Sequence, residues 1–174
     1  MKQTGKRKRV LAISSGGGHW VQLLRLQPAF EGTDVTYATV LPSSRSDIEG
    51  EFVAFGQIPD ATRWDKFKLP LLAWKLFVII LKSRPNVIIT TGAAPGFLAL
   101  VIGRFMGCRT CWIDSIANVE ELSLSGRKAK RWSTLWLTQW EHLATSEGPR
   151  YVGNVIADTE DANGSADAPE GTER

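Results

Sequence analysis

The chain has 174 residues, of which 43% are hydrophobic and 22% are charged, so it has the size and composition of one ordinary globular domain. Residues 1–156 hold 20 basic and 12 acidic residues; this excess suits an acidic partner such as anionic lipid, a sugar nucleotide or nucleic acid, and equally suits a solvated surface with no partner. Cys108 and Cys111 lack the second pair or nearby histidine that a zinc site needs, so we expect two reduced core residues in a cytosolic protein.

Both ends of the chain differ from the part between them. Residues 1–9 hold five basic residues, and the apolar run that follows, residues 10–13, is too short for an export signal or a transmembrane span. This basic arm either contacts an anionic membrane surface or only aids solubility. Residues 157–174 hold six acidic residues beside Arg174 and no apolar pattern, which predicts a disordered acidic tail. The folded domain is therefore expected over residues 10–156.

A glycine-rich stretch at residues 14–19 lies between an expected strand, residues 10–13, and a helix that begins near Trp20. Its three glycines let the backbone turn tightly, and the positive end of the following helix favours a bound anion such as phosphate. The alternative is a tight turn whose glycines serve only packing. Neither the P-loop nor the dinucleotide fingerprint is present, since the third glycine of G-x-G-x-x-G is replaced by Val21.

The next segments predict a strand at residues 34–40, a short strand at 51–55 and a loop at 56–63 that could edge a cleft. No acidic residue ends the strand at 34–40, which argues against a ribose-binding NAD site.

An almost wholly apolar helix is predicted over residues 69–81. It is too short to cross a bilayer, so it is either a buried core helix or one that lies in the membrane surface. In the second case Trp74 and Lys75 would contact the headgroup layer. Both readings hold together if one face packs on the sheet and the other meets lipid.

The order of strand, glycine stretch and helix then repeats. A strand at residues 86–91 runs into the loop Gly92-Ala93-Ala94-Pro95-Gly96, and a helix is expected over residues 97–106. In a parallel sheet both glycine loops would open at the carboxyl ends of their strands and could flank one anionic group. A further strand at 109–115 places Asp114 at the same edge, where its carboxylate would act in catalysis, orient a substrate or cap the following segment.

The last part of the chain gives weaker patterns. Three tryptophans, Trp132, Trp136 and Trp140, are four residues apart and would share one face of a continuous helix. Such a stripe is more often core or interface than a cofactor site. Residues 151–156 are typical of a short strand or of a segment that leads to a partner.

Six motifs follow one another along the chain: residues 14–19 with the Gln-Leu-Leu after them, 90–95, Asp114-Ser115, 120–126, 139–141 and 151–153. Together they resemble the bacterial PssD-type capsular and exopolysaccharide proteins. Those are similar in turn to the membrane-recruiting subunit of the eukaryotic UDP-GlcNAc transferase that adds the second sugar to dolichol diphosphate. The resemblance covers nearly all of residues 9–156. One departure is Asp114, where relatives often carry glutamate, which shortens the reach of the carboxylate by a methylene.

The resemblance implies a Rossmann-like α/β fold that forms the acceptor-side half of a GT-B glycosyltransferase such as MurG. A companion chain would supply the half that binds the UDP-sugar, and this chain alone would be inactive. The acceptor would be a polyprenyl-diphosphate-linked saccharide, and the protein would lie at the inner face of the cell membrane. No cofactor, metal or nucleic-acid partner is expected. The alternatives are a free-standing nucleotide-binding Rossmann domain and a membrane recruiter whose cleft binds nothing.

The same resemblance implies roles for individual residues. His19 would be the base that activates the acceptor hydroxyl, or else a ligand of the diphosphate, and Asp114 would be a second catalytic residue. The residues expected to hold the acceptor diphosphate are Ser15, Gly16, Gly17, Gly18, Gly92, Ala93 and Gly96.

Overall fold

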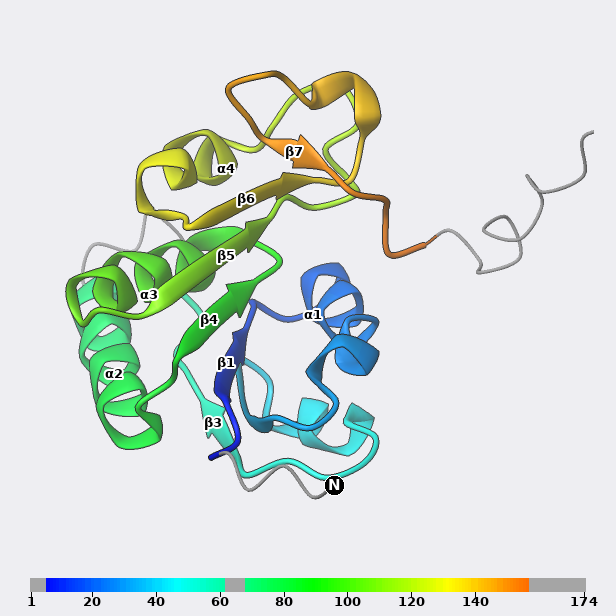
Figure 1. The fold of residues 1–174 in the computed structure, drawn as a ribbon. Helices are drawn as coiled ribbons and strands as arrows, with labels where there is room; N and C mark the ends of the chain where they lie inside the picture. The colour runs from blue at the N-terminus through cyan, green and yellow to red at the C-terminus, as the bar shows by residue number, and fades with distance from the viewer. Residues whose placement is uncertain (1–5, 62–67, 157–174) are drawn as a thin grey trace, which may run out of the picture.

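A computed structural model describes residues 6–61 and 68–156, and at its centre lies a parallel sheet of seven strands in the order β3-β2-β1-β4-β5-β6-β7 (Figure 1). Strand β1 is in the middle of the sheet, where Leu11 is in register with Thr36 of β2 on one side and Ile88 of β4 on the other. The strands are β1 (Arg9–Ile13), β2 (Asp34–Thr39), β3 (Ala54–Gln57), β4 (Val87–Thr90), β5 (Arg109–Ile113), β6 (Leu135–Thr138) and β7 (Arg150–Tyr151).

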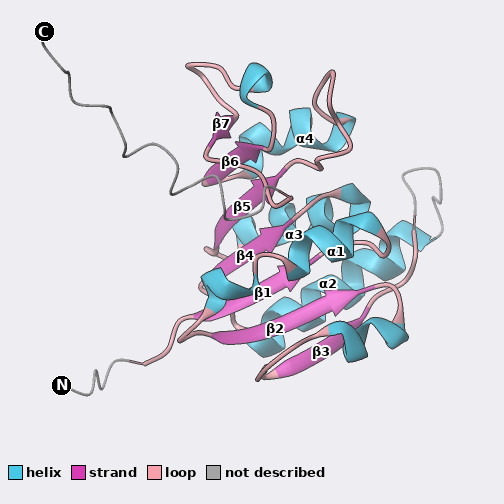
Figure 2. Ribbon diagram, turned by 90° about the vertical axis from the view of Figure 1, so that its right-hand side faces the viewer, coloured by secondary structure: helices cyan, strands magenta, loops and turns pink. Residues whose placement is uncertain are grey.

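Helices cover both faces of the sheet (Figures 1 and 2). The α-helices are α1 (Gly18–Leu24), α2 (Lys68–Ser83), α3 (Ala93–Phe105) and α4 (Leu124–Ala129). Short 3-10 helices are η1 (Gln27–Phe30), η2 (Pro42–Asp47), η3 (Lys130–Trp132) and η4 (Glu141–Leu143). In Figure 1, α1 lies on one side of the sheet, and α2 and α3 lie on the other. This is the doubly wound arrangement in which ligands bind at the carboxyl ends of the strands.

The alternation of side chains along β1 builds two separate cores. Leu11 points into a core with Leu72 and Leu76 of α2, whereas Val10 joins Trp20 of α1 on the opposite face. The two cysteines follow the same division, because Cys108 belongs to the α2 and α3 core and Cys111 to a small cluster on the other face. Both are free and buried, as predicted.

The strands predicted at residues 10–13, 34–40, 86–91 and 109–115 are confirmed, with their ends shifted by one or two residues. The strand predicted at 51–55 is displaced and forms β3, so Gly56 and Gln57 belong to a strand and not to a loop. A Cβ on Gly56 would stand 3.0 Å from Ile79, so α2 can approach β3 closely only at a glycine.

The helix expected to begin at residue 97 begins four residues earlier, at Ala93. Pro95 is compatible with this because a proline in the first helical turn removes no helical hydrogen bond. The predicted tryptophan helix is wrong. Trp132 ends η3, Trp136 lies in β6 and Trp140 follows that strand, so the three share no helical face.

Residues 151–156 were expected to form a short strand or a segment that leads to a partner; β7 is only Arg150–Tyr151, so residues 152–156 are not in a strand. Most of the basic arm (residues 1–5), part of the predicted loop (residues 62–63) and the acidic tail (residues 157–174) lie outside the described residues.

Candidate functional site

The candidate site lies where the order of the strands reverses direction, between β1 and β4. The chain leaves β1 through α1 on one face of the sheet and leaves β4 through α3 on the opposite face. In open α/β sheets such a point leaves a crevice outside the carboxyl ends of the two strands. Both glycine stretches predicted from the sequence begin here, directly after β1 and directly after β4.

The first glycine turn presents backbone donors to solvent. Gly17 has φ +65° and ψ −139°, a conformation that only glycine adopts readily, and it precedes the first residue of α1. Its carbonyl accepts hydrogen bonds from the N–H groups of Trp20 and Val21. Within the described chain, the N–H groups of Gly18 and His19 have no partner, and Gly17 and Gly18 are exposed. Unpaired N–H groups that converge at a helix start favour an anion.

His19 joins the two halves of the crevice. Its Nδ1 lies 2.8 Å from the carbonyl oxygen of Thr91, and the Thr91 hydroxyl donates a hydrogen bond to the His19 carbonyl at 2.6 Å. A carbonyl oxygen can only accept, so Nδ1 carries the proton of this bond. In the neutral ring, Nε2 is then the nitrogen with a free lone pair. This arrangement orients the imidazole as a proton acceptor at the mouth of the crevice.

The second glycine stretch is smaller than predicted, and its residues play different parts. Gly92 alone precedes the helix; its φ is +130°, and a Cβ there would stand 2.8 Å from Cε1 of His19. Gly96 lies inside α3 and is buried, and a Cβ on it would overlap the hydroxyl of Thr90. Gly96 therefore allows close packing of α3 against Thr90 of β4, and its expected contact with the acceptor stays a prediction. Ala93 is half-buried at the start of α3 with φ +62°, which is unusual for a residue with a side chain.

Asp114 follows β5 at the predicted edge, but its carboxylate points into the protein and is 1% exposed. It accepts four hydrogen bonds, from the indole N–H of Trp112, the side-chain amide of Asn118, and both the backbone N–H and the hydroxyl of Ser123. Ser123 in turn caps α4 by accepting from the N–H of Gly126. These bonds make Asp114 an anchor for the segment between β5 and α4, and the catalytic role expected of it stays a prediction.

Two buried amides that were not predicted as site residues lie beside the crevice. Gln22 of α1 and Gln139, directly after β6, are 6% and 2% exposed. The Nε2 of Gln139 donates to Oε1 of Gln22 at 2.8 Å. Both residues lie in motifs that carry the resemblance, and Gln22 is a polar residue on an otherwise apolar stretch of α1, but neither signal reveals that the two are partners.

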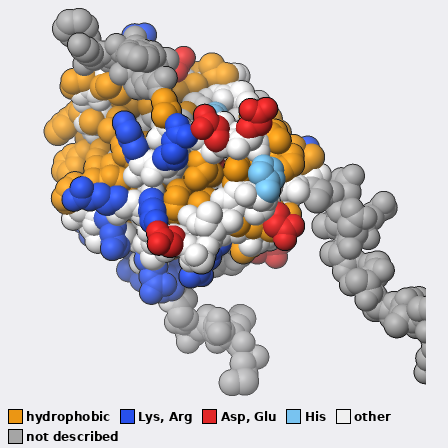
Figure 3. All heavy atoms as spheres, turned by 90° about the horizontal axis from the view of Figure 1, so that it is seen from above, with side chains coloured by type: hydrophobic (Ala, Val, Ile, Leu, Met, Phe, Trp, Pro, Cys, Tyr) orange, Lys and Arg blue, Asp and Glu red, His pale blue; other side chains and the backbone are white. Residues whose placement is uncertain are grey.

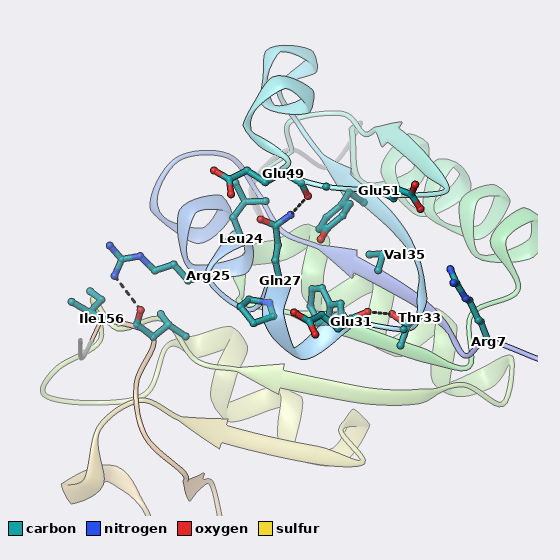
Figure 4. A pocket seen from close by; sticks show the side chains of 16 residues that line it. Arg7, Leu24, Arg25, Gln27, Glu31, Thr33, Val35, Glu49, Glu51 and Ile156 are labelled. Atoms are coloured by element: carbon teal, nitrogen blue, oxygen red, sulfur yellow. Dashed lines mark hydrogen bonds between the residues drawn. The ribbon is translucent and has the colours of Figure 1, made fainter. Parts of the chain in front are cut away.

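A hollow of about 1130 Å³ lies on the α1 side of the sheet rather than between the two glycine turns (Figure 4). Its lining includes Leu24, Arg25, Gln27, Glu49 and Glu51, and Glu49 lies beside Leu24 and Gln27. Figure 4 also shows Arg25 and Gln27 bonded to backbone carbonyls across it.

Metal ligands do not gather in the described part of the chain, where no group of three or more His, Cys, Asp or Glu side chains could hold an ion. Cys108 and Cys111 lie on opposite faces of the sheet and cannot chelate together. Burial raises the pKa of the Cys111 thiol to about 12, so this residue is protonated at neutral pH.

No protein-family model and no curated protein matches the chain. Solved structures do match. MurG from Acinetobacter baumannii is 14% identical, with 93% of this chain and 50% of that chain covered at a TM-score of 0.67. MnaA from S. aureus, in a structure with UDP, is 10% identical, with coverage of 85% and 45% and a TM-score of 0.63. A UDP-N-acetylglucosamine 2-epimerase from Rickettsia bellii is 12% identical, with coverage of 79% and 40% and a TM-score of 0.58.

At these identities the likeness shows the fold alone. The chain has a glycosyltransferase-like, Rossmann-like fold and spans about half the length of the structures it matches, as one half of a GT-B protein does. Among the described residues, no helix has both the length and the apolarity needed to cross a membrane.

Proposed function

We propose that this chain is the acceptor-binding, membrane-recruiting half of a two-chain glycosyltransferase that transfers a sugar from a UDP-sugar to a polyprenyl-diphosphate-linked saccharide. The observation that carries the proposal is the match of almost the whole chain to half of MurG, combined with a crevice that carries donors and a histidine at its edge. A companion chain would supply the other half and bind the nucleotide.

The crevice offers what a lipid-linked diphosphate requires. The diphosphate oxygens would accept hydrogen bonds from the unpaired N–H groups of Gly18 and His19 in the first turn. Ser15, Gly16 and Gly17 would line the path by which the diphosphate reaches these groups. Ala93, at the start of the thirteen-residue helix α3, would add the positive end of a second helix from the other side. The interaction needs no side-chain cation, because backbone donors at helix starts bind phosphate groups in many α/β folds.

His19 would act as the base of the transfer. The carbonyl of Thr91 holds its Nδ1–H, so Nε2 can take the proton of the acceptor hydroxyl as that oxygen bonds to the anomeric carbon. The bond from the anomeric carbon to the UDP oxygen then breaks, and UDP leaves with the electron pair. The tautomer favours this role over that of a diphosphate ligand, because only a doubly protonated ring would present an Nε2–H donor.

One face of α2 provides a membrane contact. Leu72, Leu76 and Ile80 are buried against the sheet, so the opposite face of the helix is left to solvent. That face carries large apolar side chains that are exposed: Leu71 (50%), Trp74 (63%), Phe77 (38%) and Leu81 (50%). Lys75 is exposed beside them. We propose that this stripe enters the headgroup layer, where tryptophan and lysine are both favourable.

Further exposed groups extend this surface beyond α2. Phe105, at the end of α3, is 79% exposed and packs its ring against Trp132, which Arg131 covers at 5.4 Å. Lys and Arg side chains gather on the α4 side of the molecule when it is seen from above (Figure 3). Such a combination of aromatic and basic groups suits a membrane with anionic lipids.

Calorimetric titration of the purified chain with a short-chain prenyl diphosphate and, separately, with UDP-GlcNAc tests the proposal. An acceptor half should bind the prenyl diphosphate saturably and the UDP-sugar not at all. Stoichiometric binding of UDP-GlcNAc without binding of the prenyl diphosphate would favour a free-standing nucleotide-binding domain. Binding of neither would leave the chain as a recruiter with an empty crevice.

A further inference from the structure

We infer that Gln22 and Gln139 form a buried relay through which residues 152–156 set the position of the turn that carries His19. The functional role of the relay, positioning of the acceptor site by residues 152–156, rests on the proposed function. The relay itself consists of hydrogen bonds between described residues.

Gln22 uses its whole side-chain amide. Its Nε2 donates to the carbonyl of Gly18 and to the hydroxyl of Ser115, both at 3.1 Å. Its Oε1 accepts from the N–H of Ile116 at 3.0 Å and from Gln139 at 2.8 Å. A primary amide has two donors and two acceptor positions, so none is left over. The first turn of α1 is thereby bonded to the segment after β5.

Gln139 extends this network to the end of the described chain. Besides its bond to Gln22, its Nε2 donates to the carbonyl of Asp114 at 2.9 Å, and its Oε1 accepts from the N–H of Val155 at 3.0 Å. Arg25, the residue directly after α1, donates to the carbonyl of Val155 at 3.0 Å. The residue Val155 is therefore held at both its N–H and its carbonyl group.

A movement of residues 152–156 would change the position of the His19 ring. If Val155 leaves, Oε1 of Gln139 loses its partner at a site that water hardly reaches, which favours rotation of this amide to find another. Rotation would withdraw the donor from Gln22 and so loosen the bond from Gln22 to Gly18. Gly18 is the neighbour of His19, whose Nδ1 must stay close to Thr91 to keep its tautomer. The relay thus connects a surface segment to the base through two side chains, Gln139 and Gln22, and one turn.

NMR spectroscopy of the full chain tests the relay without any ligand. The 15N signals of the His19 ring report its tautomer, and His142, the other of the two histidines, serves as an internal reference. We expect the Nδ1–H form in the wild type and a mixture of tautomers in both Gln139→Leu and Gln22→Leu. The double variant should resemble each single one, because the two residues act in series.

Gln27→Leu is the matched control. It removes an amide of the same kind, bonded to the carbonyl of Glu49, from the segment after α1 without touching the relay. We expect it to shift the unfolding midpoint but not the His19 signals. If Gln139→Leu left the signals of His19 and of the Gly17 and Gly18 amides as in the wild type, the relay would be disproved. Equal changes in Gln27→Leu would also overturn it, since they would show general loosening.

Affinity for a short-chain prenyl diphosphate supplies the functional readout. Each relay variant should bind about tenfold more weakly, which is the effect of losing one hydrogen bond. If the wild type binds no prenyl diphosphate, the proposed function fails while the NMR result still decides the relay. Should Gln139→Leu not fold, Arg25→Ala removes, from an exposed position, one of the two bonds that hold Val155 and should move the His19 signals in the same direction. Wild-type signals in Arg25→Ala would then count against the relay.

Discussion

At the scale of single residues, His19 is held by a backbone carbonyl, and its two possible roles can be separated by substitution. With a reconstituted pair of chains, His19→Ala should lower turnover by about 10²–10⁴ and leave the affinity for acceptor nearly unchanged, because a base is lost. His19→Gln should do the same, since its amide can donate but cannot take a proton. Steady-state kinetics with varied acceptor measures both quantities. A raised acceptor requirement with normal turnover would instead assign His19 to the diphosphate.

Asp114 should behave as a structural residue. Its carboxylate is 1% exposed and accepts four hydrogen bonds, so Asp114→Ala leaves buried donors without a partner. We expect the free energy of unfolding to fall by about 2–4 kcal/mol, measured by urea denaturation. A variant of wild-type stability that had lost activity would instead support the catalytic role of Asp114.

The raised pKa of the buried Cys111 thiol makes the stability of the fold depend on pH above pH 9. Burial raises its pKa from 9.0 to about 12, so above pH 9 the unfolded chain releases a proton that the folded chain keeps. Stability is therefore fully present below pH 9 and declines as the pH rises toward 12, by up to about 1.4 kcal/mol per pH unit from this group. Urea unfolding at pH 8 and pH 10 should show a smaller decline for Cys111→Ala than for the wild type. An equal decline would show that the thiol is accessible to water.

At the scale of secondary-structure elements, α2 divides into a buried and an exposed face. The double variant Trp74→Glu/Lys75→Glu should stay folded and lose at least tenfold in binding to anionic vesicles, because three units of charge change beside the membrane. Co-sedimentation with vesicles measures this, and thermal unfolding checks the fold. Arg150→Glu/Val152→Glu is the matched control, with the same change of charge at exposed sites near β7. Equal loss in both variants would mean that net charge alone acts.

Strands buried on both faces could be predicted from the sequence with nearly correct ends, whereas the ends of the exposed edge strand β3 could not. The strands near residues 10–13 and 86–91 read as apolar runs because helices cover both of their faces. β3 is a half-exposed edge strand, so no such run marks its ends. The spacing of Trp132 and Trp136 suggested a helix, but a four-residue interval says nothing when the chain passes from η3 into β6 between them.

The candidate site was predictable only in part, for a related reason. Local sequence identified His19 and its glycine turn, because tight turns depend on neighbouring residues. The contacts that orient the site join residues far apart, such as His19 with Thr91 and Gln22 with Gln139, and no periodic pattern reports which loops meet. The sequence likewise placed Asp114 at the correct edge but could not indicate that its carboxylate turns inward.

At the scale of the whole molecule, the proposed function requires a second chain. The chain has the fold of half a GT-B protein, so under the proposed function the purified chain should transfer no sugar until a companion chain is added. Transfer of radiolabelled sugar from a UDP-sugar to a lipid-linked acceptor, assayed with each chain alone and with both, measures this. Robust transfer by the isolated, monodisperse chain would contradict the two-chain proposal.

The two ends of the described domain lie at opposite ends of the strands, one at the amino ends and one at the carboxyl ends. β1 starts at the amino edge with Arg9, whereas Val155 is bonded to Gln139 at the carboxyl edge. The five residues of β1 separate these edges by about 17 Å. A nucleotide-binding half fused after residue 156 would start beside the site, at the carboxyl ends of the strands. One fused ahead of residue 6 would end at the amino ends of the strands, away from the site. A one-piece version of the proposed enzyme should therefore work in only one order of fusion, with this domain first.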